Sequence, residues 1–301
     1  MTMVGAVAGV GIDAGVANHY GDPLREQRTL LVDGAVVDRS HRDVVVVSGP
    51  DRLSWLHSLT SQHLDALPAG EWTEALVLSP HGHVEHHLRL VDDGSAVWMH
   101  VEPGTAAALV SYLESMRFML RVTVKDESAS YGVVTVLPPG GEWAPQDRFV
   151  PMAEVPATLT ESGLSVVGLG AAEAIRVAAG VPRLGFETDH RTIPHEVGWI
   201  GRAVHLDKGC YRGQETVARV HNLGRPPRRL VLLHLDGTSE TLPPPHVPVT
   251  LDERAVGFLG TALHHAELGP IALAVVKRNT PDDAHLMVEG MAAKAERVVD
   301  A

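Results

Sequence analysis

Cysteine is almost absent from this 301-residue sequence, which has a single thiol, at Cys210. One cysteine excludes an internal disulfide framework, and this usage fits a reducing cytoplasm. A single thiolate is also too few to hold an iron–sulfur cluster, which usually takes about four cysteine ligands.

Aromatic residues, basic charge and long apolar runs are scarce as well. Phe, Trp and Tyr make up 4% of the chain, and 37 acidic residues outnumber 25 basic ones, for a net charge of −12. With no stacking motif and only one short basic stretch, at residues 225–229, direct nucleic-acid binding is not expected. No run of 18 apolar residues occurs, so no membrane-spanning segment is expected. Residues 1–17 lack a basic start and are interrupted by Asp13, which makes them a poor signal peptide.

Most of the sequence has the pattern of short strands joined by turns. The β-branched run at residues 43–48 predicts a strand that ends at Gly49-Pro50, and Leu109, Leu113 and Met116 recur at helical spacing. Helix, strands, helix and strand between residues 49 and 129 predict an antiparallel sheet with helices. The regularly spaced short strands after residue 230 predict a small β-barrel or sandwich.

The most informative segment is residues 208–215, Lys-Gly-Cys-Tyr-Arg-Gly-Gln-Glu. Lys208 and Arg212 lie two positions on either side of Cys210, and Gln214 opens a plausible short helix. Neighbouring cations and a helix N-terminus both favour a thiolate, so we expect a reactive sulfur. The alternative is that a lone cysteine is a small buried apolar residue without chemistry.

This octet resembles the K-G-C-Y-x-G-Q-E signature of the YgfZ-type folate-binding proteins. These are relatives of the glycine-cleavage aminomethyltransferase that act in iron–sulfur cluster assembly or repair. Further similarity lies in residues 48–53, 176–183, 193–196, 256–257 and 268–273.

The resemblance implies an α+β protein in which three domains form a clover-like ring around a central cavity. The first domain would be split over residues 1–48 and 130–224 and would carry the cysteine motif. The second, ferredoxin-like domain would span residues 49–129. A C-terminal β-barrel would span residues 225–301.

The resemblance also implies a function and a site. Tetrahydrofolate or a related reduced folate is the expected ligand, and iron–sulfur client or assembly proteins are the expected partners. The functional thiol would be Cys210, supported by Lys208 and Arg212. The expected folate-binding residues are Tyr211, Gln214, Glu215, Glu196, Arg219 and His87.

One departure from the aminomethyltransferases concerns catalysis. Those enzymes have an aspartate near the reacting folate nitrogen in a G-x-x-x-x-D-L run, and the matching run from Gly82 has His87 at that position. A neutral imidazole cannot replace a carboxylate that stabilises developing positive charge. Support of iron–sulfur cluster assembly is therefore the leading hypothesis. Two alternatives remain: a folate-dependent, aminomethyltransferase-like one-carbon transferase, and a non-catalytic folate-binding scaffold. The sequence does not decide whether the protein catalyses a reaction.

Two groups of residues have a second interpretation. The histidines at 81, 83, 86 and 87 could suggest a metal, but His86 and His87 should point to opposite faces of a strand, so we predict no metal site and solvent-facing side chains. Arg219 and the arginines of residues 225–229 are interpreted as part of a solvated linker, or else as the positive charges that attract folate's glutamate tail.

Overall fold

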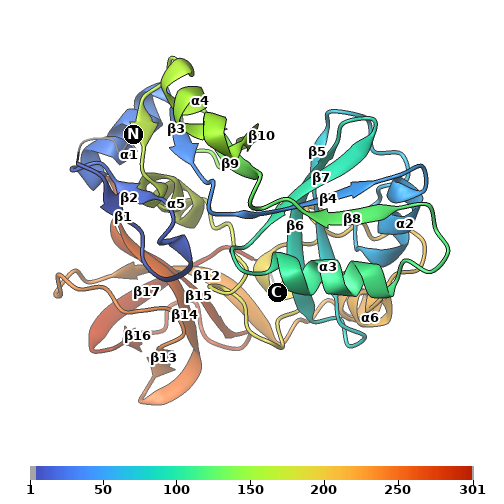
Figure 1. Cartoon of the computed structure of the whole chain (residues 1–301). Helices are drawn as coiled ribbons and strands as arrows, with labels where there is room; N and C mark the ends of the chain where they lie inside the picture. Colours follow the sequence, from blue (N-terminus) through green and yellow to red (C-terminus); the bar gives the residue numbers. More distant parts are fainter. Residues whose placement is uncertain (1–4, 300–301) are drawn as a thin grey trace.

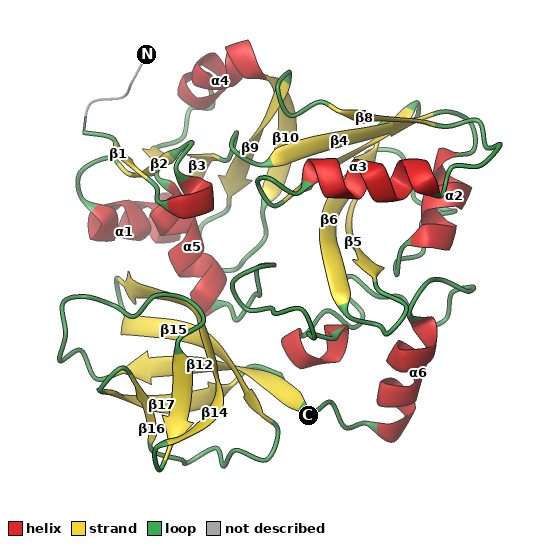
Figure 2. Cartoon of the chain, turned by 60° about the horizontal axis from the view of Figure 1, so that its bottom comes forward, coloured by secondary structure: helices red, strands yellow, loops and turns green. Residues whose placement is uncertain are grey.

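Three larger β-sheets make up the molecule, each with its own hydrophobic core (Figures 1 and 2). In Figure 1 the first sheet lies at the upper left, the second at the right and a barrel at the lower left. The computed structural model describes residues 5–299. Residues 1–4 and 300–301, the outer ends of the ranges expected for the first and third domains, lie outside the described residues. The mixture of helices and antiparallel sheets confirms the predicted α+β class.

The first sheet has four strands and helices on both faces. Its order is β10 (Gln146–Pro151), β9 (Tyr131–Leu137), β3 (Ala35–Asp38) and β11 (Val166–Val167), with only β11 parallel to its neighbour. Helices α1 (Pro23–Asp33) and α5 (Leu169–Ala178) pack on one face, and α4 (Val155–Glu161) packs on the other. Asp22 starts α1 by accepting a hydrogen bond from the Arg25 amide at 2.9 Å, and Pro23 occupies the first turn.

A small hairpin precedes this sheet. It consists of β1 (Val7–Ala8) and β2 (Ala17–His19), with the 3₁₀ helix η1 (Gly11–Asp13) between them. The short helix brings the side chain of Asp13 toward the centre of the molecule, where it meets Arg183.

The second sheet has five antiparallel strands. Their order is β5 (Trp72–Leu78), β6 (Val84–Asp92), β7 (Ala96–Val101), β4 (Asp43–Ser48) and β8 (Thr123–Asp126). Helices α2 (Arg52–Leu59) and α3 (Ala106–Ser115) cover one face through Trp55, Leu56, Leu109 and Leu113. The run of valines in β4 is buried along its whole length, as a central strand requires.

Strand β4 belongs to a different sheet from the one its position in the chain suggests. The sequence analysis placed residues 43–48 in the first domain, yet β4 pairs with β7 and β8. The β-branched run identifies a strand, but it carries no information about which distant strand lies beside it.

The C-terminal part of the chain closes into a six-stranded barrel, as the regular strand spacing predicts. The order is β12 (Arg228–Leu235), β15 (Gly269–Lys277), β14 (Arg254–His265), β13 (Pro248–Leu251), β16 (Leu286–Val288) and β17 (Met291–Arg297). Its interior is filled by small and branched side chains such as Val231, Leu233, Ala272 and Ala274. The barrel is thus a packed core and not a channel.

The arginines at the start of the barrel do not form a solvated linker. Arg228 opens β12, is half-buried and pairs with Asp189 and Glu196, while Arg229 is buried and pairs with Asp282. The linker interpretation is therefore wrong for these two arginines, because both are paired within the protein, whereas an attraction for folate's glutamate tail stays a prediction.

A shared core joins the second sheet to the barrel. The segment with the 3₁₀ helix η3 (Pro194–Val197) and helix α6 (Gln214–Leu223) runs between them. Its buried side chains, which include Trp199, Val204 and Tyr211, contact β5 on one side and the barrel on the other. Among the described residues, no helix is both long enough and apolar enough to cross a bilayer.

Candidate functional site

The loop that carries Cys210 lies at the surface. Cys210 is exposed, and α6 begins four residues later. Glycine is required at position 213, between the loop and α6, because its φ of 83° is left-handed and a Cβ there would lie 2.6 Å from the Ser79 carbonyl oxygen. The predicted helix from Gln214 is confirmed, and the thiol is open to solvent and to partners.

Lys208 fastens this loop to the end of α2. Its ammonium donates to the carbonyl oxygens of His57 and Thr60, and it also lies 4.8 Å from the centre of the Tyr211 ring. Burial lowers the pKa of Lys208 to about 8. A cation at the last carbonyls of a helix is favourable, so Lys208 positions the loop. Its predicted action on the thiol stays a prediction.

Arg212 fastens the other side of the loop. Its guanidinium pairs with Glu85 of β6 at 3.0 Å and lies 5.3 Å from the centre of the Tyr112 ring of α3. The two cations that flank Cys210 in sequence therefore each have a protein partner. The loop is held at both ends, and the thiol lies between the two anchors.

Sequence analysis did not single out a histidine cluster beside this loop. The His57 and His63 rings are 4.8 Å apart, and the His63 and His205 rings are 5.4 Å apart. A Cβ on Gly209 would lie 4.0 Å from His57 Nε2, which places this imidazole next to the residue before Cys210. No sequence spacing indicates this cluster, because its members are up to 148 positions apart.

Two of these imidazoles, those of His57 and His205, accept a backbone hydrogen bond at Nδ1, which does not suit metal binding through Nε2. Nδ1 of His57 accepts the Leu64 amide at 3.1 Å, and Nδ1 of His205 accepts the Asp207 amide at 3.2 Å. In the neutral form each ring therefore carries its proton on Nε2, the nitrogen a metal would need. Within residues 5–299, no group of three or more His, Cys, Asp or Glu side chains could hold a metal ion.

The other predicted residues of α6 and the cysteine loop occupy different environments. Tyr211 is buried, and burial raises the pKa of its hydroxyl to about 12. Gln214 is half-buried, whereas Glu215 and Arg219 are exposed and pair with each other at 3.4 Å. The structure thus brings Lys208, Cys210, Tyr211 and Arg212 together and leaves Arg219 on the outer surface.

Glu196 lies away from solvent in η3. One of its oxygens accepts the Ile193 amide at 3.1 Å, and the carboxylate also accepts two bonds of 2.8 Å from Arg228. These contacts give Glu196 a structural role at the start of the barrel. Its predicted contact with a ligand stays a prediction.

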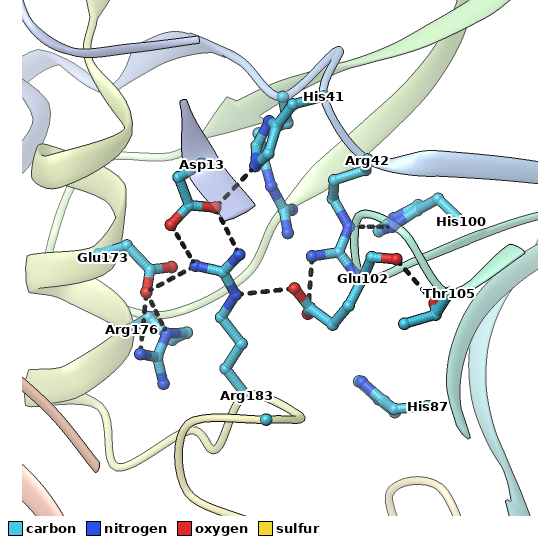
Figure 3. A network of polar contacts seen from close by, with 12 residues as sticks. Asp13, His41, Arg42, His87, His100, Glu102, Thr105, Glu173, Arg176 and Arg183 are labelled. Carbon is cyan, nitrogen blue, oxygen red and sulfur yellow. Dashed lines mark hydrogen bonds and ion pairs between the residues drawn. The ribbon is translucent and has the colours of Figure 1, made fainter. Parts of the chain in front are cut away.

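A buried network of charges connects the N-terminal hairpin, α5 and the residue that follows β7 (Figure 3). Arg183 donates to both oxygens of Asp13 and to Glu102, and Arg42 donates to the same Glu102 at 2.8 Å. The hairpin, the second sheet and the segment after α5 are therefore tied together by this one guanidinium. The similarity run at residues 176–183 contains Arg183, but sequence analysis did not assign it a partner.

His87 faces the edge of this network from β6. Its Nε2 lies 2.8 Å from Glu74 Oε2, and its ring stacks on Trp199 with the ring centres 5.0 Å apart. The pKa of Glu74 is lowered by His87 and Arg202, which outweigh the opposing effect of burial. The prediction that the histidines of this segment face solvent is wrong for His86, which is buried.

A small cavity of about 40 Å³ remains beside His87. Its lining is dominated by paired charges, among them Glu74, Arg89, Arg183 and Arg202. Glu85, His87 and Arg89 alternate along β6 and so share one face of the strand. Strand β6 thereby connects the anchor of the cysteine loop, Glu85, with the central cavity.

Comparisons with known proteins give a consistent result. The chain is 25% identical to an aminomethyltransferase of Moorella thermoacetica, over 87% of this chain and 83% of that protein. It is 28% identical to a mitochondrial iron–sulfur cluster assembly factor IBA57 homolog of Mycosarcoma maydis, over 78% of this chain and 65% of that protein. The structure superposes on the glycine cleavage system aminomethyltransferase T of Bartonella henselae with a TM-score of 0.81, covering 98% of this chain and 94% of the other at 17% identity. The chain belongs to the aminomethyltransferase-like superfamily.

Other comparisons define how far this membership extends. A putative chloroplastic transferase of Arabidopsis thaliana is 24% identical over 74% of this chain, and the match spans 60% of that longer protein. No protein-family model matches the chain. The superposition on the Bartonella henselae structure confirms the expected fold, with its C-terminal barrel.

The central cavity of this superfamily member does not fit a folate in the conformation described here. Sites for ligands of this size have volumes of about 300–1,000 Å³, far more than the space beside His87. A pterin could enter only if ion-paired side chains such as Arg89 and Arg202 moved aside.

Proposed function

We propose that this protein supports the assembly or repair of iron–sulfur clusters in client proteins, with Cys210 as the functional thiol. The observation that carries the proposal is the exposed thiol on a loop that Lys208 and Arg212 fasten at both ends. An exposed thiolate can complete the coordination of a cluster held mainly by another protein, which is all that a single cysteine allows. The similarity to an iron–sulfur cluster assembly factor supports the same role.

A reduced folate enters this proposal as a ligand of an opened state. Because the cavity beside His87 is filled by ion pairs, tetrahydrofolate binding requires the central charges to separate. We expect a rise in melting temperature only at millimolar tetrahydrofolate, since the cost of opening reduces the apparent affinity. No shift at that concentration would remove the folate part and leave the role of the thiol intact.

Aminomethyl transfer is not favoured by any contact in the site. His87 is paired with Glu74 and stacked on Trp199 at the position where the transferases have aspartate. We expect the purified protein to form no methylenetetrahydrofolate when it receives the glycine-cleavage partner proteins and tetrahydrofolate. Sustained product formation would replace our proposal with the transferase function.

Complementation tests the proposal itself. Cells that lack their own factor of this type would express the wild-type chain, and the activity of a [4Fe–4S] dehydratase would be measured in extracts. We expect activity to recover with no change in the amount of dehydratase polypeptide. A folded chain that restores no activity would contradict the proposed role.

A further inference from the structure

An apolar groove lies at the end of the molecule away from the cysteine loop. It has a volume of about 740 Å³ and runs between the N-terminal hairpin and α4. Both views place α4 far from α6, so this groove is separate from the proposed functional site (Figures 1 and 2). Its volume falls within the range of about 300–1,000 Å³ that is typical of small-molecule sites.

Small side chains keep the groove open. Ala8 and Ala17 line it from the hairpin, and Ala157 and Leu159 line it from α4. Leu159 and the neighbouring Val155 also pack against the first sheet, so the wall formed by α4 is fixed by a hydrophobic core. An apolar body placed here would lose contact with water on both sides.

Three polar side chains, Tyr20, Asp38 and Thr160, lie among these apolar side chains, and the Asp38 carboxylate favours positive charge. Asp38, at the end of β3, is half-buried and accepts only the Ser40 amide among the hydrogen bonds of the described residues, at 2.9 Å. Within residues 5–299, no arginine, lysine or histidine forms an ion pair with Asp38. Tyr20 is half-buried beside it, and burial together with the Asp38 and Glu26 carboxylates raises the pKa of the Tyr20 hydroxyl.

Glu26 is a second carboxylate near Asp38, so it adds to the negative potential at this side of the groove. Its two oxygens accept the Tyr20 amide at 2.6 Å and the Gly168 amide at 2.7 Å. Asp38 thus has no cationic partner among residues 5–299, and it lies at the side of a groove that is mostly apolar. A partly buried carboxylate is stabilised when a cation binds beside it.

We propose that this groove binds an apolar small molecule that carries a protonated amine. The ammonium contacts the Asp38 carboxylate and the Tyr20 hydroxyl oxygen, and the apolar body lies between the hairpin and α4. Charge complementarity selects an amine over an alcohol or a carboxylic acid of the same size. The small side chains select an apolar body over a polar one.

Dansylcadaverine tests the proposal on the full chain, because it joins an apolar fluorophore to a primary amine. Its N-acetylated form is the matched control, with the same fluorophore and no positive charge. We expect dansyl emission to rise on binding, and the N-acetylated form to bind about fivefold or more weakly. Equal binding of the two probes, or no binding of either at millimolar concentration, would overturn the proposal.

Three variants locate the site. Asp38→Asn keeps the oxygen that accepts the Ser40 amide and removes the charge, so it should reduce the affinity for dansylcadaverine about fivefold and leave that for the N-acetylated probe unchanged. Ala157→Phe should fill the groove and weaken both probes, whereas Ala153→Phe, at an exposed residue just before α4 that does not line the groove, should weaken neither. If Ala157→Phe binds dansylcadaverine as wild type does, the probe lies elsewhere and the groove is not the site. Unchanged binding by folded Asp38→Asn would contradict the role of the carboxylate.

Discussion

Lys208 holds the cysteine loop against the end of α2 by donating to two carbonyl oxygens. The ammonium is buried beneath the Tyr211 ring and bonds to His57 and Thr60. Sequence proximity to Cys210 predicted a different role, in which this cation would act on the thiol. Closeness along the chain shows only that two residues are near each other. The direction of the Lys208 side chain depends on partners more than 140 positions away, which no local pattern indicates.

Removing this ammonium should loosen the loop. Lys208→Met keeps most of the apolar stem and leaves the two carbonyl oxygens unpaired, so we expect the free energy of unfolding to fall by about 1–3 kcal/mol. Amide hydrogen exchange in residues 208–215 should also become faster. Urea unfolding would measure the first effect and mass spectrometry the second.

Arg219→Met is the matched control, since Arg219 is exposed and, in the part of the chain that the structure describes, pairs only with exposed Glu215 across one helical turn. It should change stability by less than about 0.5 kcal/mol. Equal effects of the two substitutions would show that Lys208 does not anchor the loop.

At the scale of elements, the turn between β5 and β6 packs directly on the start of α6. A Cβ on Gly82 would lie 2.7 Å from Thr216 Cβ, and one on Gly213 would lie 3.0 Å from Gly82 Cα. This close approach sets the position of the helix that follows Cys210. Several helices and strands were predictable from local patterns, such as the valines of β4 and the apolar spacing of Leu109 and Leu113 in α3. The choice of partner sheet for β4 and the start of β12 at Arg228 were not, since both depend on contacts between distant segments.

Substitution of Gly213 tests this packing. In Gly213→Ala the alanine would have to adopt a left-handed φ of 83°, and its Cβ would clash with the Ser79 oxygen at 2.6 Å. The substitution should therefore destabilise the protein by about 2–3 kcal/mol. Gly209→Ala is the matched change within the same motif, because the nearest contact of its Cβ is 4.0 Å, to His57 Nε2. Thermal unfolding should separate the two variants. Similar melting temperatures would mean that α6 is free to shift.

The buried charges at the centre act on the molecule as a whole. Asp13, Glu102 and Arg183 come from three separate parts of the chain, and their interaction links the hairpin, the second sheet and the segment after α5. No sequence pattern predicts such a network, because its members are 81 and 170 positions from Arg183. The resemblance indicated a central cavity, but only the side chains show that charges fill it.

Acid should destabilise the whole molecule through this network. Burial and the neighbouring Arg42 guanidinium, which outweigh Asp147, lower the pKa of His100 to about 3. Between about pH 6.5 and 3 the unfolded chain binds a proton at this site and the folded chain does not. The contribution of His100 is thus fully present above about pH 6.5 and is lost as the pH falls, by up to about 1.4 kcal/mol per pH unit.

His100→Gln removes the titrating group and keeps a neutral side chain between Arg42 and Asp147. Its free energy of unfolding should therefore depend less steeply on pH than that of the wild type between pH 6.5 and 4.5. Urea titrations at several pH values would give both slopes. If the slopes are parallel, His100 does not remain neutral in the folded protein.

The most direct test of our central claim is the ability of Cys210→Ser to restore iron–sulfur enzyme activity in cells that lack a factor of this type. Because Cys210 is exposed, the substitution should change the free energy of unfolding by less than about 0.5 kcal/mol. We predict that this folded variant accumulates as the wild type does and restores none of the [4Fe–4S] dehydratase activity. Full recovery of that activity by Cys210→Ser would contradict the functional role of the thiol.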